Sequence, residues 1–214
     1  MKLQKMGGYA SIISACITVI GVLIFASIFR GFDTTGLGIY DPAKMLTAYQ
    51  ASSMGFCAFY LLGIIGSILL FLVFLALEER MRTDAPLLMR IAVIAASSSV
   101  TLSITTMIGG FFRNVLLAAT NDMSAFRAFL VLHEFLGASA AFALGWGFLL
   151  IGWTAIRSRK LPQILGYIII LFGIGSVISF VFIVSQFMLG SIINILLQLI
   201  VFTWLGIVLL RKSA

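Results

Sequence analysis

The side chains in this sequence that could do chemistry are few, and they stand inside apolar stretches. His133 and Glu134 are adjacent in FLVLHEFLGASAAF, and Asn194 and Gln198 are four residues apart in INILLQLI. A spacing of four puts both amides on one face of a helix. Ionisable and amide groups are costly in hydrocarbon, so each of these residues is a candidate functional group.

Arginines near the ends of the apolar runs supply a counter-charge for this candidate group. Arg113 and Asn114 follow one apolar run, and Arg127 precedes the run that contains Glu134. Either arginine could neutralise the Glu134 carboxylate. We therefore predict one contiguous polar cluster. Its candidate members are His133, Glu134, Arg113, Asn114, Asn194 and Gln198.

The predicted cluster has three readings. It could be an interhelical network that fixes the register of the helices, or an outward-facing cavity that binds a small amphiphile, a lipid or an ion. The third reading is a haem site with His133 as one axial ligand and Met107 or Met188 as the second. The chain has a single histidine, so two histidine ligands cannot come from one copy. Apart from this haem reading, no cofactor is expected.

No known catalytic or metal-binding motif is present in the sequence. We find no HExxH, no GxSxG and no phosphate-binding loop. Cys16 and Cys57 have neither CxxC nor Cys/His spacing, which gives no metal site. The sequence therefore predicts a non-enzymatic protein.

The composition is that of a membrane protein. Hydrophobic residues make up 62% of the chain and charged residues 10%, with a mean hydropathy of +1.18. Soluble domains carry roughly 25% charged residues. Backbone in lipid must satisfy its own hydrogen bonds, as helices and closed barrels do. The apolar runs lack two-residue alternation, so we predict an all-α, polytopic membrane bundle.

Six membrane-spanning helices can be placed in a single domain of residues 1–214. Each is long enough to cross a hydrocarbon core of ~30 Å at ~1.5 Å per residue. The expected helices run from about Gly8 to Phe29, Ser52 to Leu77, Leu87 to Phe112, Ser124 to Ile156, Pro162 to Ser185 and Leu189 to Leu210. Ser124 is the expected cap of the fourth helix, and Met45 to Tyr49 is expected to form a short interfacial helical turn.

The basic residues predict that both termini face the cytoplasm. With that orientation, ten of the fourteen lie inside: Lys2, Lys5, Arg80, Arg82, Arg90, Arg157, Arg159, Lys160, Arg211 and Lys212. The outer side holds Arg30, Lys44, Arg113 and Arg127. The net charge of +7 is thus topogenic and does not indicate nucleic acid. We expect a multi-pass protein of the cell membrane, the inner membrane in a bacterium.

Small residues predict where the helices touch. Gly137, Ala141 and Gly145 recur every four residues, so they share a helix face with His133. Small residues allow close approach of helices in lipid, and we expect this stripe to form the closest helix contact in the bundle. The hydroxyl groups of the third helix are expected to bond to carbonyls of their own helix and to neighbouring helices. The alternative is that they form a wall of a polar cavity.

Part of the chain resembles a known family. The stretch HEFLGASAAFALGWGFLLIGW, followed by IRSRKLPQILGYIIILFGIG, is similar to the bacterial six-helix membrane proteins of domain of unknown function 4386. The matching positions are His133, Gly137, Gly145, Gly152, Arg157, Leu161, Pro162, Leu165 and Gly166. The resemblance implies a six-helix fold and a membrane location, and it implies no reaction.

These observations lead to two predictions of function. The first is a non-enzymatic membrane subunit or small binding protein, with the lipid bilayer and a homo-oligomer or larger membrane complex as partners. The alternative is a small-solute transporter or a ligand or lipid sensor, which would use an outer-leaflet cavity around His133 and Glu134. Transporters often have broken helices at matching positions of two halves, and the sequence shows none.

Overall fold

The structure, a computed structural model, describes residues 2–28, 42–113, 122–185 and 188–211, with the side chains of residues 180–192 outside the description. Over these ranges the chain forms seven helices and no strand. They are α1 (Lys2–Ile28), α2 (Pro42–Ala51), α3 (Ser53–Met81), α4 (Pro86–Phe112), α6 (Met123–Ser158), α7 (Gln163–Ser185) and α8 (Met188–Leu210).

Five of the described helices are long and apolar enough to cross a membrane. These are α1, α3, α4, α6 and the Ile193–Leu210 part of α8. The fully described part of α7, Gln163–Ser179, is apolar but shorter. The prediction of an all-α chain is confirmed, and the helices are those of a membrane protein by length and composition.

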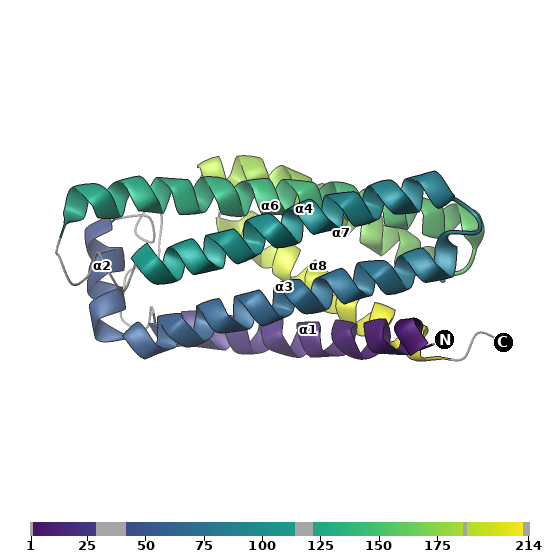
Figure 1. The fold of residues 1–214 in the computed structure, drawn as a ribbon, viewed down its shortest axis with the longest axis horizontal. Helices are drawn as coiled ribbons and strands as arrows, with labels where there is room; N and C mark the ends of the chain where they lie inside the picture. Colours follow the sequence, from purple (N-terminus) through teal and green to yellow (C-terminus); the bar gives the residue numbers. More distant parts are fainter. Residues whose placement is uncertain (1, 29–41, 114–121, 186–187, 212–214) are drawn as a thin grey trace.

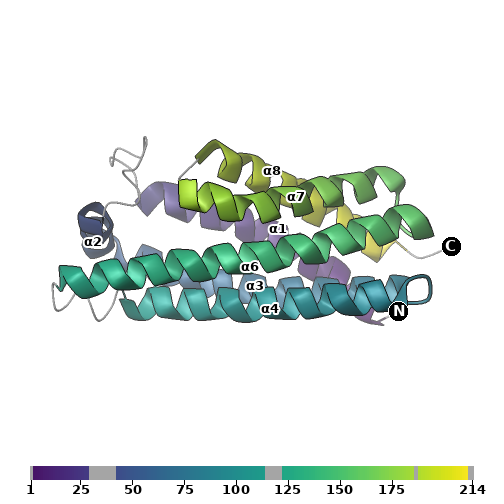
Figure 2. The same cartoon turned by 90° about the horizontal axis from the view of Figure 1, so that it is seen from above.

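The long helices lie side by side along one axis (Figures 1 and 2), and their contacts close them into a ring. Each packs on the next along the chain, and α8 packs back on α1. Both termini lie at one end of the bundle, which we call the termini end, and α2 lies across the other, the α2 end (Figure 1).

Four phenylalanines fill the middle of the ring. Phe148 of α6 is centred 4.9 Å from Phe74 of α3, 4.9 Å from Phe172 of α7 and 6.0 Å from Phe202 of α8. All four are fully or almost fully buried. Edge-on aromatic pairs at such separations are favourable, so these rings hold four helices to one centre.

Paired glycines bring α6 and α7 into backbone contact. A Cβ added to Gly145 would lie 2.7 Å from the carbonyl oxygen of Gly173, and one added to Gly152 would lie 2.8 Å from that of Gly166. Both pairs are seven residues apart on each helix, so they recur on the same antiparallel seam. Side chains larger than hydrogen do not fit there without a shift of backbone.

The predicted stripe on α6 follows this seam only in part. Gly145 is in it, but an added Cβ on Gly137 would meet only Thr106 of α4, at 3.8 Å. A step of four residues turns a helix face by about 40°. Over the 36 residues of α6, the contact face therefore passes from α4 to α7. The close contact continues from Gly145 to Gly152 rather than back through Ala141 to Gly137.

Local details of the helices differ from expectation at two points. Asp122, not Ser124, caps α6: its Oδ1 accepts hydrogen bonds from the Ser124 and Ala125 amides, both at 3.0 Å. The helix begins one residue earlier than predicted, which moves the cap outward. In addition, α1 begins at Lys2 instead of Gly8, because helix continues past the apolar run into the basic segment.

Hydroxyl groups of α4 bond to their own helix, as expected. Ser97, Ser98, Thr105 and Thr106 donate to carbonyls four residues earlier at 2.7–3.1 Å. The short helical turn expected over Met45–Tyr49 is part of a longer helix, α2.

Candidate functional site

A buried arginine stands at the α2 end, where three helices meet. Arg113 forms the C-cap of α4 and is 2% exposed. Its Nη2 donates a hydrogen bond of 3.1 Å to the hydroxyl of Tyr60 on α3. Its guanidinium carbon lies 5.2 Å from the ring centroid of Phe126 on α6, a cation–π arrangement. The charge is therefore held by groups from both neighbouring helices.

His133 of α6 is fixed in one orientation beside this arginine. Its Nδ1 lies 3.1 Å from the carbonyl oxygen of Thr106 on α4. A carbonyl can only accept, so Nδ1 donates and a neutral ring keeps Nε2 as an acceptor. The ring also stands edge-on to Tyr60, with centroids 6.2 Å apart. We call Arg113, Tyr60, Thr106, Phe126, His133 and Glu134 the Arg113 group.

A glycine makes this arrangement possible. A Cβ added to Gly110 of α4 would lie 2.7 Å from the Tyr60 ring and 2.9 Å from the imidazole of His133. The two rings thus approach the α4 backbone more closely than any side chain at this position would allow.

Glu134 is half-buried next to the arginine without touching it. Neither Arg113 nor Arg127, the two arginines predicted as its counter-charge, lies within 4.0 Å of the carboxylate over the described ranges. Within the described part of the chain, Glu134 makes no hydrogen bond and no ion pair within 4.0 Å. Its carboxylate and the Nε2 of His133 are therefore polar atoms that the described fold does not use.

Helix α2 covers this end of the bundle with apolar and aromatic surface. Tyr49 of α2 packs against Phe56, and Phe56 packs against Tyr60, with ring centroids 5.5 and 6.2 Å apart. Burial raises the pKa of Tyr49, and the nearby Cys57 adds to the rise, so this tyrosine is neutral at pH 7. Tyr60 thus links the α2 surface to the arginine.

The two amides on α8 lie outside the Arg113 group. The Nδ2 of Asn194 is 3.5 Å from the Ser176 hydroxyl of α7, and the Nε2 of Gln198 donates to the Thr18 hydroxyl of α1 at 3.1 Å. Because α8 stands between α7 and α1 in the ring, its amides meet those helices and not α4. The candidates therefore form two groups instead of one contiguous cluster.

Three further candidates are not members of the group. Asn114 and the side chain of Met188 lie outside the described residues. The sulfur of Met107, the other methionine considered as a haem ligand, packs against Gly63 of α3. Among the described residues, no three His, Cys, Asp or Glu side chains gather as a metal site would require.

Sequence reasoning missed Tyr60, Phe126 and the carbonyl of Thr106. A signal exists for Tyr60 and Thr106, because each stands near the same end of the bundle as His133 and at a similar depth in its predicted helix. Matching polar and aromatic residues by depth would have selected Tyr60 and Thr106. It would also have selected Asn194 and Gln198, because depth does not say which helices are neighbours in the bundle.

The Arg113 group combines a cation, an imidazole acceptor and a carboxylate in an apolar setting. Such groups recognise a polar or charged headgroup by hydrogen bonds and ion pairs, which low polarity strengthens. The arrangement is suited to binding.

No protein-family model, curated protein or solved structure matches the chain. The resemblance to domain of unknown function 4386 accordingly stays a prediction.

Proposed function

We propose that this chain is a six-span, non-enzymatic protein of the cell membrane, with both termini in the cytoplasm, that acts as a binding subunit. The apolar character of α7 supports the sixth span, and the closed ring leaves a place for it between α6 and α8. Arg80, Arg82, Arg157 and Lys160 stand in or beside turns at the termini end, as the excess of positive charge in cytoplasmic loops requires.

One observation carries the binding role. In the Arg113 group, the Nε2 of His133 and the carboxylate of Glu134 are half-buried and have no partner in the described chain. A network that served only to fix helix register would use these atoms, because unsatisfied polar groups in hydrocarbon are costly. A ligand or a partner subunit that satisfies them would offset this cost. The ligand class is a small amphiphile or lipid headgroup with both donor and acceptor atoms.

The competing function is that of a structural subunit. In that case the Arg113–Tyr60 and His133–Thr106 contacts only lock α3, α4 and α6 together. The two functions differ in what substitution of His133 does. Loss of a binding group removes a bound molecule while the fold is kept, whereas loss of a structural group lowers stability.

The experiment is native mass spectrometry of the protein extracted from its own membrane in a mild detergent. We expect the native chain to carry a bound small molecule or a partner subunit that His133→Ala no longer carries. Gln198→Ala is the matched control, since Gln198 is polar, half-buried and outside the Arg113 group.

Thermal unfolding of the same three samples separates the alternatives. If the role is binding, His133→Ala should unfold at nearly the same temperature as the native chain once the bound species has been removed from both. If neither the native chain nor the variants carry any bound species, and His133→Ala is strongly destabilised, the group is structural and the binding role is wrong.

A further inference from the structure

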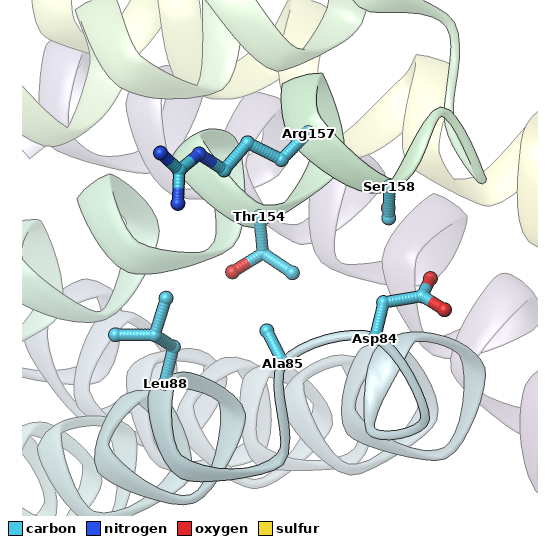
Figure 3. A pocket seen from close by; sticks show the side chains of 6 residues that line it. All are labelled: Asp84, Ala85, Leu88, Thr154, Arg157 and Ser158. Carbon is cyan, nitrogen blue, oxygen red and sulfur yellow. The ribbon is translucent and has the colours of Figure 1, made fainter.

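A cavity of about 140 Å³ lies at the termini end, far from the Arg113 group. It opens where the turn between α3 and α4 meets the last turns of α6 (Figure 3). Its lining comes from Asp84, Ala85, Leu88, Thr154, Arg157 and Ser158. The proposed binding role at the other end makes no use of it.

Thr154 has a buried hydroxyl that faces this cavity and bonds to nothing. The residue is 1% exposed, and its Oγ1 has no hydrogen-bond partner. Figure 3 shows the oxygen directed into the space between Arg157 and Leu88. Four other helical threonines, Thr18, Thr47, Thr105 and Thr106, donate to the carbonyl four residues earlier at 2.7–2.9 Å. Thr101 and Thr203 show no such bond in the described chain, but their side chains are exposed. Thr154 is buried and yet makes no such hydrogen bond.

The same cavity touches the uncapped start of a long helix. Ala85 is the N-cap of α4 and offers no side-chain hydrogen bond, and Pro86 follows it. The amides of the first turn therefore lack the side-chain acceptor that Asp122 gives to α6. Unpaired amides and the helix dipole together favour an anion at such a terminus. Ala85 and Leu88 carry this turn to the cavity wall.

The charges around the cavity also favour an anion. Arg157 is stacked on Trp153, 5.1 Å from the ring centroid, and has no carboxylate within 4.0 Å in the described chain. Asp84, the acidic residue of the lining, is neutralised by Lys160, whose Nζ is 3.1 Å from Oδ2. Ser158 accepts a long hydrogen bond from the Lys160 amide at 3.4 Å, and its own hydroxyl proton stays available.

We propose that this cavity binds a phosphate group, either that of a phospholipid headgroup or a free phosphate ion. The Thr154 and Ser158 hydroxyls, the α4 amides and Arg157 are all donors, and phosphate oxygens are strong acceptors. A cation is disfavoured in this cavity, because the positive end of the α4 dipole and the guanidinium of Arg157 would repel it. Leu87 and Trp153, each next in sequence to a residue of the lining, have exposed side chains that give acyl chains an apolar surface to follow.

The experiment measures binding to the purified full chain in detergent, with dioctanoyl phosphatidic acid as the probe. Dioctanoylglycerol has the same acyl chains without the phosphate, and inorganic phosphate has no chains. We expect saturable binding of the phosphatidic acid and at least about tenfold weaker binding of dioctanoylglycerol, since the donors of the cavity then have no charged acceptor. Competition by inorganic phosphate at similar concentration identifies the free ion as the source, and its failure to compete identifies the lipid.

Two variants connect binding to this cavity. Thr154→Val removes only the unpartnered hydroxyl and should weaken the binding of phosphatidic acid by about fivefold. Arg157→Gln should weaken it by about tenfold. Thr105→Val and Arg211→Gln are the matched controls, because they change an exposed threonine and an exposed arginine that do not line the cavity.

The outcomes decide the matter even if one variant folds poorly. Thr154→Val is nearly isosteric, and Arg157 is on the surface, so size-exclusion chromatography should give native profiles for both. Equal binding of dioctanoylglycerol and phosphatidic acid would overturn the proposal, as would native affinity in Arg157→Gln. Either result leaves the Arg113 group and its proposed role untouched, since that group lies at the other end.

Discussion

Gly145 of α6 and Gly173 of α7 face each other with no side chain between their backbones. A Cβ on either would come within 2.9 Å of the partner's carbonyl oxygen, and the Gly152–Gly166 pair repeats this seven residues along. In lipid, such close packing is what holds neighbouring helices together, because no hydrophobic force acts between them.

Enlarging Gly145 should therefore open the α6–α7 seam. Gly145→Leu is expected to lower the free energy of unfolding by roughly 1–3 kcal/mol, because the backbones must separate. Thermal unfolding in detergent measures the change. Gly137→Ala is the control, since its new methyl would make only an ordinary contact of 3.8 Å with Thr106. Equal stability of Gly145→Leu and the native chain would mean that α7 does not pack here.

The hydroxyl of Tyr60 should be needed to keep Arg113 buried. Tyr60→Phe removes the acceptor of a hydrogen bond from a guanidinium that is 2% exposed. Hydrogen bonds to charged groups contribute about 1.5–3 kcal/mol, and we expect a loss in that range on denaturation. Tyr167→Phe alters a tyrosine that is 58% exposed and should have no effect. A stable Tyr60→Phe would mean that the charge has other sufficient partners.

Asp122 and Ser124 should differ in their effect on the start of α6. Asp122→Ala leaves two amides without their acceptor, and a lost N-cap costs about 0.5–2 kcal/mol. Hydrogen exchange at Ser124 and Ala125 should become faster in that variant. Ser124→Ala removes a side chain that caps nothing and should leave exchange unchanged. If hydrogen exchange became faster only in Ser124→Ala, the capping residue of α6 would be Ser124 and not Asp122.

The orientation in the membrane can be tested with single cysteines in a Cys16→Ser, Cys57→Ser background. Both termini lie at one end, so Arg211→Cys reports on that end and Lys44→Cys, in α2, on the other. We expect a membrane-impermeant maleimide to label Lys44→Cys on intact cells and Arg211→Cys only after lysis, because the basic excess belongs to the cytoplasm. The reverse pattern would invert the topology.

The sequence predicts where the helices of this chain begin and end far better than it predicts which helices pack against one another. Apolar runs and a proline at the start of α4 mark the helix ends within a few residues, except at the start of α1, because hydrocarbon leaves the backbone no other hydrogen-bonded form. His133 and Arg113 could be brought together on depth alone. The amides of α8 could not be assigned, because Asn194 and Gln198 share one helix face and yet bond to α7 and α1. That outcome depends on which helices flank α8, and hydropathy says nothing of it.

Closure of the ring by α8 on α1 has a consequence for how the protein is made. Ser11 donates to the carbonyl of Phe202 at 2.6 Å across 191 residues, and Gly8 and Gly206 pack beside this bond. During synthesis α1 enters the membrane long before α8 exists, whereas α6 and α7 are separated by a short turn and can insert as a hairpin. Until α8 has been made, the face of α1 that will pack on it is therefore exposed to lipid or to an insertion factor. Premature termination ahead of α8 would leave five of the six long helices and one exposed polar edge, a form that membrane quality control can recognise.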